Sequence, residues 1–150
     1  MTLPLAEAVQ QCRRHADVLT SAMADLPPRF AVEHVRAPDP GLVRTTDQFV
    51  LRFIKLQDTL GEHVLRTFTG DVLGEPVSDL PLIDVLNRLE RYGFLELRRW
   101  ARWSALRNSL THEYPEHPEI RAALLNEALD ATPGLVDLLD RIQQRVDRVG

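Results

Sequence analysis

The sequence predicts an all-α protein, an antiparallel helical bundle of four long helices plus one short helix. Three observations lead to this prediction. Apolar residues recur at steps of three and four along most of the chain, prolines separate these segments, and no segment shows the alternation of a β-strand. A length of 150 residues suits one domain. We therefore expect a single helical domain over residues 1–150.

The first long helix is expected over residues 5–26, because one apolar stripe runs through it and Pro27 and Pro28 follow it. Cys12 falls within the stripe. A free cysteine there is expected to be a small core residue rather than a nucleophile. The stripe comprises Leu5, Val9, Cys12, Ala16, Leu19, Met23 and Leu26.

Residues 27–44 carry four prolines and no clear period, which predicts a long loop with an extended stretch around residues 30–35. Thr45, with Gln48 three residues later, has the pattern of a capping box. The second long helix is therefore expected to begin at Thr45 and to reach about Phe68, with Gly70 near its end. Its stripe comprises Phe49, Phe53, Leu56, Leu60 and Val64.

A polar turn over residues 70–78 is expected to precede the short helix. Asp79 is its expected cap, Pro81 lies in its first turn, and Gly93 is expected to end it. Its apolar face comprises Leu82, Val85, Leu86 and Leu89.

The third long helix is expected from about residue 94 to residue 112, because Pro115 disfavours helical geometry at Tyr114. The last helix is expected to begin at Pro118. Its apolar face continues to Val146, with a kink or restart at Thr132-Pro133.

The net charge of −4 argues against a generally basic nucleic-acid coat protein. The charge is uneven, however. Residues 88–107 hold six arginines and two acids, a local charge of +4, so the rest of the chain carries −8. Arginine suits phosphate recognition, although genomic base composition or a solvated helix face would give the same bias.

One cysteine, Cys12, cannot form an internal disulfide, and no run of 18 apolar residues exists. The first residues lack the basic region and apolar core of a signal peptide. We therefore expect a cytoplasmic protein with no membrane contact.

Side chains capable of chemistry gather at the end of the third long helix, in Arg107, Asn108, His112, Glu113 and Tyr114. Asn108 and His112 are four residues apart and share a helix face. Arg107 and His112 are about 140° apart on an ideal helix. They would converge if the helix frays, or if each met its counterpart from a second subunit across a two-fold axis.

The segment 107–114 reads R-N-S-L-T-H-E-Y. This pattern resembles the R-X4-6-H signature of HEPN domains, in the R-X4-H-X-Y form of HepT-like toxins. The preceding short helix, its apolar-Gly-apolar turn and the Trp-rich helix also look like that family. The resemblance is clearest over residues 79–118 and upstream rests on the number and order of helices.

The resemblance implies a HEPN-like homodimer that cuts RNA without a metal or cofactor. Arg107 would bind the scissile phosphate, His112 would exchange protons, and Asn108 would orient His112 or the phosphate. Arg99 and Arg102 are candidate RNA-binding residues. Tyr114 matches the tyrosine to which, in such toxins, a minimal nucleotidyltransferase antitoxin adds AMP. The partners implied are RNA, this antitoxin and a second copy of the chain.

Other interpretations stay open from the sequence. The chain is alternatively a catalytically inactive HEPN module that binds a nucleotidyltransferase, or a plain helical scaffold with an accidental match. Trp100 and Trp103 are expected in the core or a dimer interface rather than stacked on bases. His112, Glu113, Glu116 and His117 are metal-ligand types without supporting spacing, so we expect no metal site. His15, His34 and His63 are expected to be solvated.

Overall fold

A computed structural model describes residues 3–149. Within that range every regular element is helical and no strand occurs, which confirms the all-α prediction at this level. The elements are α1 (Leu5–Ala24), α2 (Val32–Arg36), α3 (Pro40–Thr59), the π-helical turn η1 (Leu60–Val64), α4 (Leu65–Asp71), α5 (Leu82–Arg91), α6 (Leu97–Leu110) and α7 (Pro118–Val149).

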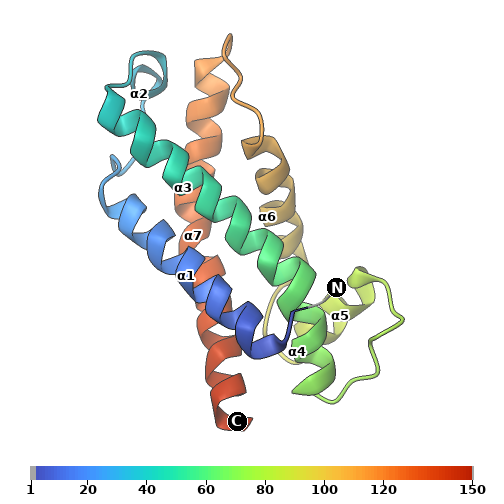
Figure 1. The fold of residues 1–150 in the computed structure, drawn as a ribbon. Helices are drawn as coiled ribbons and strands as arrows, with labels where there is room; N and C mark the ends of the chain where they lie inside the picture. The colour runs from blue at the N-terminus through green and yellow to red at the C-terminus, as the bar shows by residue number, and fades with distance from the viewer. Residues whose placement is uncertain (1–2, 150) are drawn as a thin grey trace.

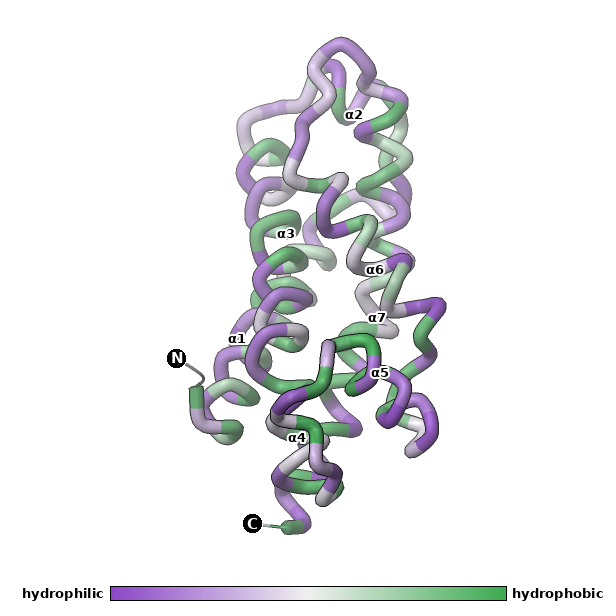
Figure 2. The backbone as a smooth tube through the Cα atoms, turned by 90° about the vertical axis from the view of Figure 1, so that its right-hand side faces the viewer, coloured by the Kyte–Doolittle hydropathy of each residue, from purple (hydrophilic) through white to green (hydrophobic). Residues whose placement is uncertain are grey.

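The longer helices pack side by side. α3 contacts α1, α6 and α7, while α7 also contacts α1 and α6. Figure 1 shows α2 and the connection from α6 to α7 at one end of the molecule, and α4 and α5 toward the other. Hydrophobic and hydrophilic residues alternate along each helix in Figure 2, as expected for amphipathic helices that share one core.

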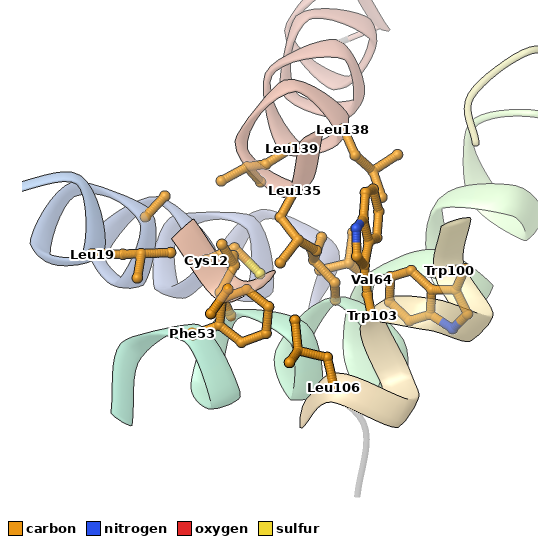
Figure 3. Packing of buried hydrophobic residues seen from close by; sticks show 14 of the residues in the cluster. Cys12, Leu19, Phe53, Val64, Trp100, Trp103, Leu106, Leu135, Leu138 and Leu139 are labelled. Carbon is orange, nitrogen blue, oxygen red and sulfur yellow. The ribbon is translucent and has the colours of Figure 1, made fainter. Parts of the chain in front are cut away.

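The core joins residues from all these helices. Figure 3 shows Cys12 and Leu19 of α1 near Phe53 of α3, with leucines of α7 above them. Cys12 is fully buried, as its place in the stripe predicted. Trp100 and Trp103 are 4% and 6% exposed, so both side chains lie in the core of the single chain.

The prediction of a long loop over residues 27–44 was wrong. Residues 32–36 form α2, where an extended stretch was expected, and α3 begins at Pro40. The cap of α3 is Asp39, whose Oδ1 accepts a hydrogen bond from the backbone N–H of Leu42 at 2.8 Å. The Thr45 hydroxyl instead donates to the carbonyl of Gly41 from inside the helix, so the expected capping box at Thr45 and Gln48 does not begin the helix.

The second predicted helix continues further than expected, through η1 and α4 to Asp71. The short helix α5 begins later than expected, with Pro81 at its cap position and no side-chain cap, so Asp79 does not cap it. Gly93 follows α5 with a positive φ of 79°, in agreement with its predicted role at the helix end.

The last helix begins at Pro118 as predicted and runs unbroken to Val149, with Pro133 inside it rather than at a restart. Gly134 follows that proline at the contact with α6. A Cβ placed there would lie 2.8 Å from Cζ2 of Trp103, so the absence of a side chain permits the close approach of α6 and α7.

Three histidines expected to be solvated are half-buried instead. Nδ1 of His34 accepts a hydrogen bond from the backbone N–H of Ala31, and Nδ1 of His15 contacts Nη1 of Arg52 at 3.0 Å. Nδ1 of His63 is buried without a partner among the described residues. Helix packing covers these rings, a contact that the local sequence does not reveal.

Candidate functional site

The candidate site is carried by the end of α6. Trp100, Trp103, Leu106 and Leu110 anchor the helix in the core, and their spacing leaves Arg107 and Asn108 on its accessible side. The helix ends at Leu110, two residues before the predicted end, and the Thr111 hydroxyl donates to the carbonyl of Asn108 at 2.6 Å. His112 therefore lies beyond the helix rather than on it.

Arg107 is held against α3 by a bidentate ion pair. Its Nε donates to Oδ1 of Asp58 and its Nη2 to Oδ2 of Asp58, both at 2.7 Å. The hydrogen bond to Asp58, opposed by partial burial, raises the pKa of Arg107, so the guanidinium keeps its positive charge. Both side chains are 28% exposed. Arg107 is thus oriented but still accessible.

Asn108 lies beside the other end of the guanidinium. Nη1 of Arg107 points to Oδ1 of Asn108 at 3.4 Å, a long contact. Of the five N–H donors of an arginine, Asp58 engages one on Nε and one on Nη2. The remaining donors, on the Nη1 side, are the ones able to reach a ligand.

Asp58 is a residue of the site that the sequence analysis missed. It lies 49 positions from Arg107, and no motif links the two. The neighbouring pair supports the same contact between helices, since Nε2 of Gln57 donates to Oγ of Ser104 at 2.8 Å. Only the packing of α3 on α6 brings these polar side chains together.

His112 and Tyr114 form a second group in the connection from α6 to α7. Their rings meet edge to face, with centroids 6.0 Å apart and planes at 80°. His112 is exposed, and Tyr114 is half-buried with a positive φ of 54°. This left-handed conformation is uncommon for a tyrosine and fits the prediction that Tyr114 cannot be helical before Pro115.

Arg121 of α7 holds this connection in place. It is 8% exposed, and its Nη1 donates to the carbonyls of Leu110 at 3.2 Å and His112 at 2.9 Å. Burial lowers the pKa of Arg121, although the charges of Glu113 and Asp47 oppose that shift. The sequence analysis did not single out this arginine, because a buried arginine has no distinctive sequence pattern.

Two larger cavities lie beside α6, and the predicted residues divide between them. A cavity of about 570 Å³ is lined by Glu113, Tyr114 and Arg121, together with residues of α2 and α3. A second, of about 580 Å³, lies between α6 and α7 and is lined by Arg99 and Arg102. Arg107, Asn108 and His112 line neither of these two cavities.

The structure thus gathers the predicted site residues into separate groups within one chain. Arg107 and Asn108 lie with Asp58, and His112 lies with Tyr114. Arg99 and Arg102 line the cavity between α6 and α7, where Cζ of Arg99 is 5.1 Å from the Trp103 ring centroid.

Among residues 3–149, no group of three or more His, Cys, Asp or Glu side chains is arranged to hold a metal ion. No helix in the same range is long and apolar enough to cross a membrane.

Comparisons with known proteins add no relative to this description: no family model, no curated protein and no solved structure matches the chain.

Proposed function

We propose that this protein is a metal-independent endoribonuclease, a HepT-like HEPN toxin of a bacterial toxin–antitoxin pair. The observation that carries the proposal is the state of the R-X4-H-X-Y segment. Arg107 is charged, accessible and oriented by two hydrogen bonds to Asp58, and the exposed His112 follows directly after the end of α6.

In the proposed reaction, the donors of Arg107 that Asp58 leaves available bind the oxygens of the scissile phosphate and stabilise their growing negative charge. His112 takes the proton from the attacking 2′-hydroxyl or gives one to the leaving 5′-oxygen. The 2′-oxygen forms a bond to phosphorus while the bond to the 5′-oxygen breaks. The products are a 2′,3′-cyclic phosphate and a 5′-hydroxyl.

The proposal includes a homodimer, because Arg107 contacts α3 while His112 lies beyond α6 in the same chain. A two-fold axis near this end of α6 brings Arg107 of one protomer toward His112 of the other. Asn108 orients His112 or the phosphate in this composite site. Arg102, exposed on α6, and Arg99 contact the RNA backbone.

Tyr114 is the proposed site at which a small nucleotidyltransferase antitoxin adds AMP. Its half-buried ring borders the cavity of about 570 Å³ and packs against His112. A phosphodiester on this hydroxyl would bring negative charge next to His112, where it would compete with RNA. The modification would therefore switch the nuclease off.

The test of the nuclease measures RNA cleavage and growth arrest on induced expression. We expect Arg107→Ala and His112→Ala each to lower cleavage by at least about a hundredfold, since each removes a group acting on the transition state. Arg107→Lys is expected to restore little, because lysine lacks the planar fork of donors.

Two controls match these variants. Arg13→Ala removes another half-buried ion pair, to Asp140, and His117→Ala removes another exposed histidine of the same connection. Both are expected to keep full activity. If Arg107→Ala and His112→Ala fold and still arrest growth as the wild type does, the catalytic assignment is wrong.

The modification is tested by co-expression with the nucleotidyltransferase encoded beside this gene. We expect the intact mass to rise by one or more AMP groups, and Tyr114→Phe to prevent the increase. Tyr92→Phe, which changes an exposed tyrosine elsewhere, is the control and should be modified normally.

One observation favours the second candidate, an inactive HEPN module that binds a nucleotidyltransferase. Asp58 already neutralises the Arg107 charge through two hydrogen bonds, and a phosphate must share that arginine with it. The neighbouring nucleotidyltransferase gene with no RNA cleavage by the wild type would favour this candidate. Absence of that gene would weaken both readings.

A further inference from the structure

The end of the molecule that holds α5 carries an exposed aromatic side chain. Tyr92 follows the last residue of α5 and is 46% exposed. Its hydroxyl donates to Oε1 of Glu75 at 3.0 Å, and Gly93 turns the chain next to it with a φ of 79°. The tyrosine ring is therefore held in place while it remains open to solvent.

A hollow lies on each side of this tyrosine. One, of about 210 Å³, is lined by Tyr92, Glu75, Arg88 and Arg91. The other, of about 250 Å³, is lined by Tyr92 together with Arg141, Arg145 and Arg148 of α7. Across both hollows, five arginines accompany one carboxylate, in a chain whose net charge is −4.

The arginines of α7 reach this place because of their spacing. Arg141, Arg145 and Arg148 recur at steps of four and three and so share one face of the helix. Arg141 ties that face to the turn after α5, since its Nη1 and Nη2 donate to the carbonyls of Gly93 and Phe94. The other two extend past the turn toward Tyr92.

Three of the five arginines have no assigned structural task. Arg88 pairs with Glu75, and Arg141 with Asp137 and the two carbonyls. Arg91, Arg145 and Arg148 are exposed and have no hydrogen-bond or ion-pair partner within residues 3–149. Figure 2 shows this end of α5 as strongly hydrophilic. The three guanidinium groups are thus available to an external anion.

We propose that Tyr92, Arg91, Arg145 and Arg148 form a binding site for single-stranded nucleic acid. The phenol ring stacks on a base, and the three arginines contact the phosphates on either side of it. An aromatic ring between free cations is the arrangement that single strands require, because their bases expose their faces whereas those of a duplex do not.

This site lies apart from the proposed cleavage site. Tyr92 precedes the 14 residues of α6, and His112 follows them, which places roughly 20 Å of helix between the two. The inference does not depend on the proposed cleavage, because stacking and phosphate contact need no reaction. If the chain does cut RNA, this site would hold a segment of the substrate away from the bond that is cut.

The experiment measures the fluorescence anisotropy of a labelled twelve-nucleotide oligodeoxythymidylate with the full chain. This probe lacks the 2′-hydroxyl, so binding is measured without cleavage. Tyr92→Ala is expected to weaken binding about tenfold, from the loss of one stacked base. Tyr92→Phe, which keeps the aromatic face, should stay within about twofold of the wild type.

Salt dependence tests the arginines. Replacing Arg145 and Arg148 together by alanine should reduce the slope of log K against log salt by about 1.4, or about 0.7 for each phosphate contact on a single strand. Arg14→Ala removes an exposed arginine of α1 and should leave the slope nearly unchanged. An oligouridylate of equal length, with the His112→Ala protein, should bind comparably.

Several results would overturn the proposal. These are wild-type affinity in Tyr92→Ala, equal affinity for a duplex of the same length, or no binding of either oligonucleotide. Binding of phosphatidylserine vesicles without oligonucleotide binding would instead assign the patch to a membrane surface. A loss of growth arrest in His112→Ala with unchanged oligonucleotide affinity would leave the proposal intact, so the two sites can be judged separately.

Discussion

The ion pair between Arg107 and Asp58 changes how the arginine of the motif is understood. In the sequence, Arg107 is one of six arginines within residues 88–107, and nothing distinguishes it except its distance from His112. In the structure its guanidinium is oriented by a carboxylate at 2.7 Å on two sides. A bidentate pair restricts the rotation of the side chain, so the remaining donors point in a defined direction.

Cys12 illustrates a residue whose role follows from its position alone. It is fully buried, and burial raises the pKa of its thiol to about 12. We expect the native protein to react very slowly with an aromatic disulfide reagent at about pH 8, because the thiolate is the reactive form. In roughly 6 M guanidinium chloride the same thiol should react fully and quickly. Rapid stoichiometric reaction of the folded protein would contradict this.

His15 predicts a pH dependence of stability. Burial lowers its pKa below the usual 6.5, and the charges of Arg52, Lys55 and Arg14 add to the shift. Arg52 can only donate, so Nδ1 of His15 accepts their 3.0 Å hydrogen bond and protonation would break it. Below pH 6.5 the unfolded chain therefore binds the proton more readily than the folded one, and stability falls as the pH falls.

The measurement for His15 is the free energy of unfolding in urea at about pH 7.5 and about pH 5.5. We expect the decrease between these values to be smaller in His15→Asn than in the wild type. His117→Asn, at an exposed histidine, is the control. An equal decrease in His15→Asn and the wild type would show that His15 does not contribute.

At the scale of helices, the start of α3 distinguishes two candidate caps. Thr45 has the sequence pattern, but Asp39 makes the hydrogen bond to Leu42 N–H. Asp39→Ala is expected to lower the free energy of unfolding by about 1 kcal/mol. Thr45→Ala should change it by less than about 0.5 kcal/mol, since its hydroxyl bonds within an already formed helix. Denaturant unfolding of both variants checks the order, and a larger loss in Thr45→Ala would contradict the assignment.

The same segment explains why helix starts were predicted less well than helix faces. The apolar stripes repeat over many residues and tolerate single errors. A cap depends on one side chain, and several polar residues near Pro40 are chemically suitable. The residues around α2 add to this difficulty, because their helix is short and rests on α7, where Asn126 bonds to both the N–H and the carbonyl of Phe30.

At the scale of the whole molecule, the proposed composite site makes a prediction about mixed dimers. Arg107→Ala and His112→Ala protomers are each expected to be inactive alone. Refolded together, half of the dimers would be mixed, and each mixed dimer would contain one intact site with Arg107 from one protomer and His112 from the other. RNA cleavage is therefore expected to recover to about a quarter of the wild-type rate.

The control mixes Arg107→Ala protein with itself under the same refolding conditions and should stay inactive. Light scattering gives the oligomeric state of each sample. A monomeric wild type, or dimers that regain no activity on mixing, would rule out a site shared between protomers.

Hydrophobic periodicity and proline positions were sufficient to predict that this chain is helical, where most helices lie and that Cys12, Trp100 and Trp103 are buried. These features are local, because helix period and proline geometry act over a few residues. The same local reading placed Arg107, Asn108, His112 and Tyr114 at the end of one helix.

Packing alone decided the contacts between distant residues. It paired Arg107 with Asp58, held His112 through the buried Arg121, and collected Tyr92 with arginines more than 50 positions further along the chain. Such contacts depend on how helices pack against one another, and each helix face is compatible with many neighbours when read in isolation. The chemistry-bearing residue types are therefore visible in the sequence, whereas their partners and orientations arise only when the core brings the helices together.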